Sequence, residues 1–215
     1  ILLTALVHYS SLPELAPEQE SEGEDLSTSK TSIFQFPHLI LGAITLFCYV
    51  GVEVIAGDTI AGYASTQGFT LEKAKFFASF ELFNMLIGYG IGIFAIPKYL
   101  KQEQALRLSA IAGLLFVTGA LLTHGLVSVI FVALFGISNA LCWPSIWPLA
   151  IDGLGKFTKI GSSLLVMAIG GGAVLPLLYG WMADRLGAHD AYVLVIPCYA
   201  MILLYAWKLH KIRLR

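Results

Sequence analysis

One stretch of the sequence constrains the fold more than any other: from Leu126 to Ala150, no side chain carries a formal charge. A helix of this length crosses the ~30 Å hydrocarbon layer of a bilayer. The composition agrees, because 57% of the 215 residues are hydrophobic and 13% are charged, whereas roughly a quarter of the residues of a soluble domain are charged. The sequence therefore predicts a membrane protein.

Six apolar runs share this character, near 38–64, 75–97, 106–124, 126–152, 160–183 and 191–209. Backbone groups in lipid must be hydrogen-bonded within the protein, so only helices and closed barrels span membranes. The connections are too short and the runs too continuous for a barrel of alternating strands. We therefore expect an all-α, polytopic fold with a six-helix transmembrane domain over 37–215.

The residues ahead of these runs divide into two parts. Residues 1–9 have the character of the end of a preceding transmembrane helix, without the basic flank or cleavage site of a signal peptide. Residues 10–36 combine Ser, Pro and Gly with six acids, a composition typical of a solvated linker. We expect this acidic linker to be cytoplasmic.

The distribution of basic residues supports that orientation. A cytoplasmic linker places ten Lys and Arg residues inside and three outside, which obeys the positive-inside rule. The inner set is Lys30, Lys98, Lys101, Arg107, Lys156, Lys159, Lys208, Lys211, Arg213 and Arg215, and the outer set is Lys73, Lys75 and Arg185. We expect a multi-pass protein of the cell (inner) membrane whose carboxy terminus is cytoplasmic.

Covalent chemistry is not indicated. Cys48, Cys142 and Cys198 lie in separate apolar runs without paired spacing, and the histidines show no metal-ligand pattern. The buried residues include no nucleophile with a partner base. We therefore expect no enzyme activity, no metal and no cofactor.

Polar residues at membrane depth are the main functional candidates, because each costs a few kcal/mol unless it faces water, a cavity or a partner. They fall in three spans, which we expect to line a pathway. The first span carries Tyr49, Glu53 and Asp58, the second Glu81 and Asn84, and the fourth Asn139, Trp143 and Trp147.

The fourth span also contains two prolines, in Trp143-Pro144-Ser145-Ile146-Trp147-Pro148. Prolines interrupt helices and free backbone carbonyls, and interrupted helices mark many transporter sites. An indole face covers the C–H face of a hexose, while Asn and Glu side chains bond its hydroxyls. The alternative is a proline kink with interfacial tryptophan anchors, which suits Trp147 at least as well as ligand contact.

The carboxylates have two interpretations. Glu53 serves either as a hydroxyl acceptor or proton carrier of the pathway, or as a charge paired to a neighbouring helix. For Glu81, near the outer boundary of its run, the two interpretations are equally supported. The Gly88/Gly92 pair and the run Gly170-Gly171-Gly172 indicate close helix packing, with a hinge as the alternative.

Three segments together resemble a known family. They are Phe47-Cys48-Tyr49-Val50-Gly51-Val52-Glu53, Trp143-Pro144-Ser145-Ile146, and the loop Gly153-Leu154-Gly155-Lys156-Phe157-Thr158-Lys159-Ile160-Gly161-Ser162-Ser163, followed by the triple glycine and Pro176. In order and spacing they are similar to the carboxy-terminal half of the fucose/galactose/glucose–proton symporters of the major facilitator superfamily.

The resemblance implies twelve helices in two halves, a sugar site between the halves, and alternating access coupled to protons. Trp143 corresponds to an aromatic position of the sugar site, where the fucose carrier has a tyrosine, and Glu53 corresponds to a glutamine there. These differences favour the glucose/galactose branch. The proton-carrying carboxylates of the family belong to the amino-terminal half, which is expected as a partner.

The sequence thus predicts a hexose–proton symporter half whose partners are a sugar, a proton, the lipid bilayer and the amino-terminal half, with no nucleic acid. The predicted substrate-binding residues are Trp143, Glu53, Asn84, Asn139, Tyr49, Asp58 and Trp147. The rival hypothesis is a membrane-embedded sensor or structural subunit that binds a sugar without transporting it.

Overall fold

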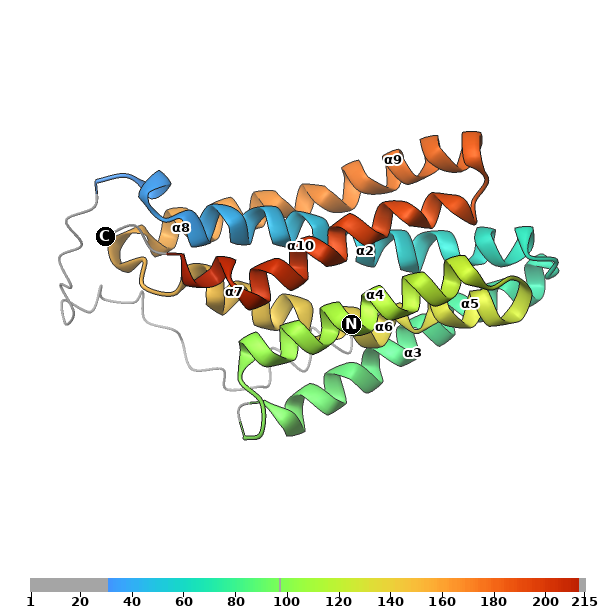
Figure 1. Ribbon diagram of the computed structural model, residues 1–215, viewed down its shortest axis with the longest axis horizontal. Helices are drawn as coiled ribbons and strands as arrows, with labels where there is room; N and C mark the ends of the chain where they lie inside the picture. The colour runs from blue at the N-terminus through green and yellow to red at the C-terminus, as the bar shows by residue number, and fades with distance from the viewer. Residues whose placement is uncertain (1–30, 97, 213–215) are drawn as a thin grey trace, which may run out of the picture.

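The computed structural model describes residues 31–96 and 98–212, which form a bundle of helices (Figure 1). The α-helices are α2 (Pro37–Thr66), α3 (Leu71–Ala95), α4 (Gln102–Leu122), α5 (Gly125–Ala133), α6 (Phe135–Ala140), α7 (Cys142–Ile151), α8 (Thr158–Met167), α9 (Gly171–Leu186) and α10 (Val195–Trp207). Short 3-10 helices lie between or beside them: η1 (Ile33–Gln35), η2 (Gly155–Phe157), η3 (Ala168–Gly170), η4 (Asp190–Leu194) and η5 (Leu209–Lys211).

These helices make six spans in the described part of the chain, each long and apolar enough to cross a membrane. The spans are Pro37–Thr66, Leu71–Ala95, Gln102–Leu122, Gly125–Ile151, Gly155–Leu186 and Asp190–Trp207. The predicted all-α fold with six spans is therefore confirmed. Consecutive spans run in alternating directions between the two ends of the bundle (Figure 1).

The predicted amino-terminal parts lie mostly beyond this description. The helix end at 1–9 falls outside the described residues, as does the acidic linker up to residue 30. From Thr31, a short segment with η1 leads into α2, which begins at Pro37. Proline suits this first helical position because its missing N–H would have no partner there.

The fourth and fifth spans are interrupted, as the prolines and glycines predict. In the fourth span, a turn at Leu141 separates α6 from α7, with Pro148 inside α7. In the fifth span, η3 replaces one α-helical turn just before Gly171. A proline cannot donate to the preceding turn, so the helix changes direction close to it. A second break at Leu134 has no proline beside it.

Helix α2 lies at the centre and packs against α3, α7, α9 and α10. Two glycines explain how closely its neighbours approach it. A Cβ atom added to Gly171 of α9 would meet the backbone carbonyl oxygen of Phe47, and one added to Gly51 would meet the side chain of Leu175. Small residues at such contacts allow dispersion interactions between helix backbones.

Side-chain hydrogen bonds close the bundle at both ends. At one end, His189 Nδ1 lies 2.9 Å from the hydroxyl of Tyr63, which also contacts Ser128. At the other end, Tyr205 donates to the His38 carbonyl oxygen (3.1 Å), and His210 Nε2 lies 2.9 Å from Glu103 Oε2. These bonds connect helices that are distant in sequence, which fixes their register.

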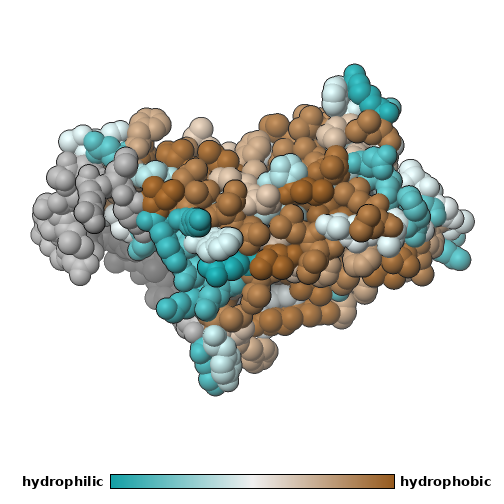
Figure 2. All heavy atoms as spheres, in the orientation of Figure 1, coloured by the Kyte–Doolittle hydropathy of each residue, from teal (hydrophilic) through white to brown (hydrophobic). Residues whose placement is uncertain are grey.

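The surface between the two ends is apolar, as the brown band across Figure 2 shows. Coverage by neighbouring helices is uneven. In the most apolar window of each span, 61% of α2 is buried, but only 22% of α3 and 28% of the span that contains α9. The two spans that flank α2 thus leave wide apolar faces for lipid or another protein segment.

Candidate functional site

Three aromatic side chains from α2 and α7 form what we call the aromatic wall: Tyr49, Trp143 and Trp147. The indoles of Trp143 and Trp147 stack with ring centroids 5.6 Å apart and planes 19° from parallel. The Tyr49 ring meets Trp143 edge-on at 6.4 Å. The two tryptophans are one helical turn apart, so the helix period places them on one face of α7.

Glu53 lies one turn after Tyr49 on α2 and is bonded to it. The Tyr49 hydroxyl donates to Glu53 Oε1 over 2.8 Å, which leaves the second carboxylate oxygen for other donors. Glu53 is half-buried and interacts electrostatically with Tyr89 and Cys142. A hydrogen-bond acceptor therefore stands beside an aromatic surface, as the spacing in the sequence predicts.

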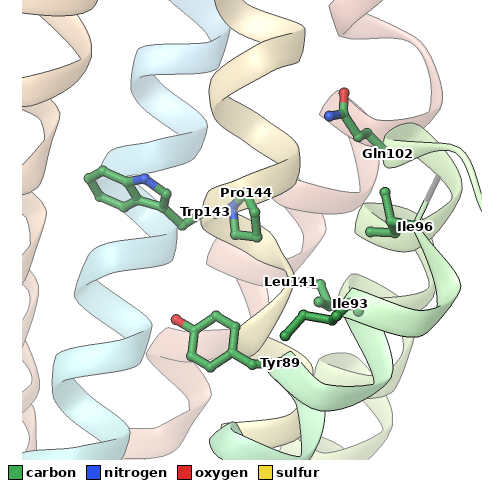
Figure 3. A pocket seen from close by; sticks show the side chains of 8 residues that line it. Tyr89, Ile93, Ile96, Gln102, Leu141, Trp143 and Pro144 are labelled. Carbon is green, nitrogen blue, oxygen red and sulfur yellow. The ribbon is translucent and has the colours of Figure 1, made fainter. Parts of the chain in front are cut away.

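A cavity of about 410 Å³ borders the aromatic wall at Trp143. Its lining comes from α3, from the start of α4 and from the junction of α6 and α7: Tyr89, Gly92, Ile93, Ile96, Gln102, Leu141, Trp143 and Pro144. In Figure 3 the side chains of Tyr89 and Trp143 both extend toward the pale-blue α2. The volume falls within the usual range for small-ligand sites, as does the mixture of apolar walls with few polar groups.

Tyr89 and Gln102 are cavity residues that the sequence reasoning missed. A signal for Tyr89 existed, since it is the sole tyrosine of the second span and stands between Gly88 and Gly90. Gln102 offers no comparable signal, because it opens a helix at the membrane boundary.

The two predicted asparagines lie elsewhere in the bundle. Asn84 Nδ2 donates to the Ala133 carbonyl oxygen over 3.0 Å, which joins α3 to α5. Asn139 Oδ1 accepts from the Tyr199 hydroxyl over 2.9 Å, which joins α6 to α10. Both side chains are buried. Their amides thus make helix-to-helix contacts, and the cavity lining does not include them.

The remaining predicted residues are also placed. Asp58 is exposed, little more than one turn beyond Glu53 on α2. Trp147 is half-buried against Trp143. Glu81, expected near the outer boundary of its span, is buried about 15 Å along α3 from Leu71, because the helix starts earlier than the apolar run.

Several curated proteins are similar to this chain, although no family model matches it. A glucose/galactose transporter of Brucella abortus is 36% identical over 195 residues, which cover 88% of this chain and 47% of the relative. A putative glucose/galactose transporter of Helicobacter pylori is 28% identical, covering 98% and 52%. An L-fucose–proton symporter of Haemophilus influenzae is 32% identical, covering 79% and 42%. The chain spans about half the length of these relatives.

Solved structures show the same relationship at the level of the fold. A crystal structure of the Escherichia coli fucose:proton symporter superimposes with a TM-score of 0.79 at 24% identity. It covers 95% of this chain and 51% of the symporter chain. A structure of FucP, a major facilitator superfamily transporter, in the outward conformation gives the same TM-score and covers 50% of that chain.

The names of the relatives, the shared fold and the half-length coverage agree with the resemblance of the three sequence segments described above. The relatives are transporters rather than enzymes, and their fold is a multi-pass helical bundle. The homologues, together with the fold, thus fit the carboxy-terminal half of a fucose/galactose/glucose symporter of the major facilitator superfamily.

Proposed function

We propose that this chain is the carboxy-terminal half of a hexose–proton symporter that carries glucose or galactose by alternating access. The observation that carries the proposal is the aromatic wall, which borders the cavity through Trp143 and is bonded to Glu53 through Tyr49. The names of the relatives support sugar and proton as cargo.

Each residue of this cluster has a distinct task. The indole of Trp143 covers the apolar C–H face of the pyranose ring, and Trp147 extends that surface. Glu53 accepts hydrogen bonds from sugar hydroxyls through the oxygen that Tyr49 leaves available. Tyr49 fixes the carboxylate in position by donating to its other oxygen.

The choice of hexose follows from the same acceptor. Glucose and galactose carry a hydroxymethyl group where fucose, a 6-deoxy sugar, has a methyl group. An ionised carboxylate only accepts hydrogen bonds, so an additional hydroxyl donor suits Glu53 and a methyl group does not. The Brucella abortus relative, which is 36% identical and named a glucose/galactose transporter, supports the same choice over the fucose symporter at 32% identity.

A second six-helix half is the proposed partner. The apolar faces of α3 and α9 are the least covered surfaces of the described bundle, and they flank the central helix α2. A partner half that rests on α3 and α9 would close the sugar site from the open side. We place the protein in the cell (inner) membrane with its carboxy terminus in the cytoplasm, on the charge distribution of its loops.

Asn84, Asn139 and Asp58 stay predicted sugar ligands outside this core proposal. For Asn84 and Asn139 to serve, their amides would have to exchange contacts with Ala133 and Tyr199 for contacts with sugar. Asp58 would need the sugar to reach the exposed side of α2.

The test uses the transporter assembled from both halves, with Trp143→Ala and Glu53→Gln as variants. Each should weaken glucose or galactose binding, measured by quenching of tryptophan fluorescence, by about tenfold or more, which equals ~1.4 kcal/mol. Trp207→Ala is the matched control, because Trp207 is exposed at the end of α10. Unchanged affinity in both variants would remove the proposed site.

Uptake of radiolabelled sugar into proteoliposomes distinguishes transport from binding alone. A symporter accumulates sugar when a pH gradient is imposed, whereas a sensor or structural subunit binds sugar without accumulation. Binding without accumulation in the assembled protein would favour that rival hypothesis.

A further inference from the structure

Glu81 is the most deeply buried carboxyl group that the described residues contain outside the proposed sugar contacts. Its side chain is 1% exposed, and its Oε1 atom has no hydrogen-bond partner in the described part of the chain. The ion pairs recorded for those residues both involve Glu103, at an end of the bundle. A buried acid without a cation requires an explanation, because an unpaired ion in an apolar interior costs several kcal/mol.

The backbone of α2 leaves space for this carboxyl group. Gly57 lies opposite, and a Cβ atom added there would stand 3.9 Å from Glu81 Oε2. Glu53 lies one turn before Gly57, and the two carboxyl groups interact electrostatically. Glu81 therefore points at the face of α2 that also presents Glu53.

Other titratable groups around the pair are neutral hydroxyls and a thiol. Tyr49 of α2, Tyr89 of α3 and Cys142 of α7 interact with Glu53, and Tyr199 of α10 interacts with Glu81. None of these groups is a cation that would compensate two negative charges.

A second unpartnered group marks the same region. Asn139 is fully buried, and its Nδ2 atom has no hydrogen-bond partner among the described residues, although its Oδ1 accepts from Tyr199. An unused acceptor on Glu81 and an unused donor on Asn139 thus both lie near Tyr199. Buried polar groups of this kind are usually hydrogen-bonded to the protein or to an internal water.

We propose that Glu53 and Glu81 together form a proton-binding site within this half of the transporter. Two carboxylates on neighbouring helices without a cation beside them repel, so one proton bound by the pair reduces the uncompensated charge. The proton resides on either oxygen pair, and the neutral carboxylic acid needs only ordinary hydrogen bonds.

Bound sugar determines which of the two carboxyl groups holds the proton. This part of the inference rests on the proposed function of Glu53. Hydroxyl groups that donate to Glu53 favour its ionised form, and a charged Glu53 favours a protonated Glu81. The sugar-loaded half therefore carries its proton on Glu81, behind the binding residue. The coupling is reciprocal, so a proton on Glu81 also favours the Glu53 state that accepts sugar.

The first experiment needs no sugar. Infrared spectra of the purified, lipid-reconstituted protein should show the C=O stretch of a buried carboxylic acid over a pH titration. Glu81→Gln should remove one such band, and Glu53→Gln should move the pH range over which the remaining band disappears. Glu72→Gln, on the exposed first turn of the same helix, should leave both unchanged. A carboxylic acid band that survives unaltered in Glu81→Gln and Glu53→Gln overturns the proposal.

The second experiment records the infrared difference on adding glucose or galactose. The wild type should gain the Glu81 carboxylic acid signal, and Glu81→Gln should lose this gain while it still binds sugar. Gly57→Ala serves as a second variant where Glu81→Gln fails to fold, because its methyl group contacts the carboxyl and should shift the band. Absence of sugar binding in the wild type refutes the proposed substrate and leaves the first experiment decisive for the proton site.

Discussion

At the scale of single residues, Tyr49 joins the two parts of the site, because its ring meets Trp143 and its hydroxyl donates to Glu53. Tyr49→Phe keeps the ring and removes the donor. A hydrogen bond to a charged group is worth about 1.5–3 kcal/mol, so we expect sugar affinity to fall by about tenfold or more. Isothermal titration of the assembled transporter measures this change.

Tyr179→Phe is the control for this substitution. Tyr179 is also buried and also donates, but to the Ala188 carbonyl oxygen near the end of α9. We expect its loss to leave sugar affinity unaltered. Equal affinity in Tyr49→Phe and the wild type would show that Tyr49 does not position Glu53.

The sequence could predict local pairs of residues better than distant ones. Tyr49 with Glu53, and Trp143 with Trp147, are separated by one helical turn, so the helix period alone brings each pair together. The contacts of Asn84 with Ala133 and of Asn139 with Tyr199 join separate helices. Such contacts depend on helix rotation and register, which a hydropathy pattern does not specify.

At the scale of elements, Gly171 determines how closely α9 approaches α2. A methyl group at this position would meet the Phe47 carbonyl oxygen, which is backbone and cannot rotate away. Gly171→Ala should therefore destabilise the bundle by about 1–3 kcal/mol, the usual cost of overpacking. Thermal unfolding of the purified protein in detergent should show a lower midpoint.

Gly170 supplies the matched control for that variant. It is the preceding residue, and a Cβ atom added to it has no neighbour within 4 Å. Gly170→Ala should change stability by no more than about 0.5 kcal/mol. Equal stability of the two variants would mean that α2 and α9 are not held together at Gly171.

Element boundaries show why part of the architecture was predictable. Prolines and glycines announced the interruptions of the fourth and fifth spans, because proline removes a donor and glycine permits close approach. The break at Leu134 was not predicted, although Gly136 follows it two residues later and lets α6 approach the α3 backbone at Glu81. Helix α3 begins at Leu71, within polar sequence, because helix formation continues past the apolar boundary.

At the scale of the whole molecule, the main property that the hydropathy pattern did not reveal is how unevenly neighbouring helices cover the six spans. Hydropathy identifies α3 and α9 as membrane helices, but it does not distinguish apolar surface that suits lipid from apolar surface that suits another protein segment. The second half proposed above would cover these faces. The proton site proposed at Glu81 would then lie on the side of α3 that faces α2.

Orientation in the membrane is the remaining whole-molecule prediction. Of the basic residues assigned to the inner side, Lys30, Arg213 and Arg215 lie outside the described residues, but Lys156 lies in η2, at the start of the fifth span. Leu186 ends α9 at the opposite end of the same span. Both side chains are exposed.

Single cysteines at these positions, with Cys48, Cys142 and Cys198 replaced by Ala, should therefore label from opposite sides. A membrane-impermeant maleimide added to intact cells without an outer-membrane barrier should modify Leu186→Cys, and should modify Lys156→Cys only after permeabilisation. The reverse pattern would place the carboxy terminus outside and would show that the loop charges do not determine the orientation.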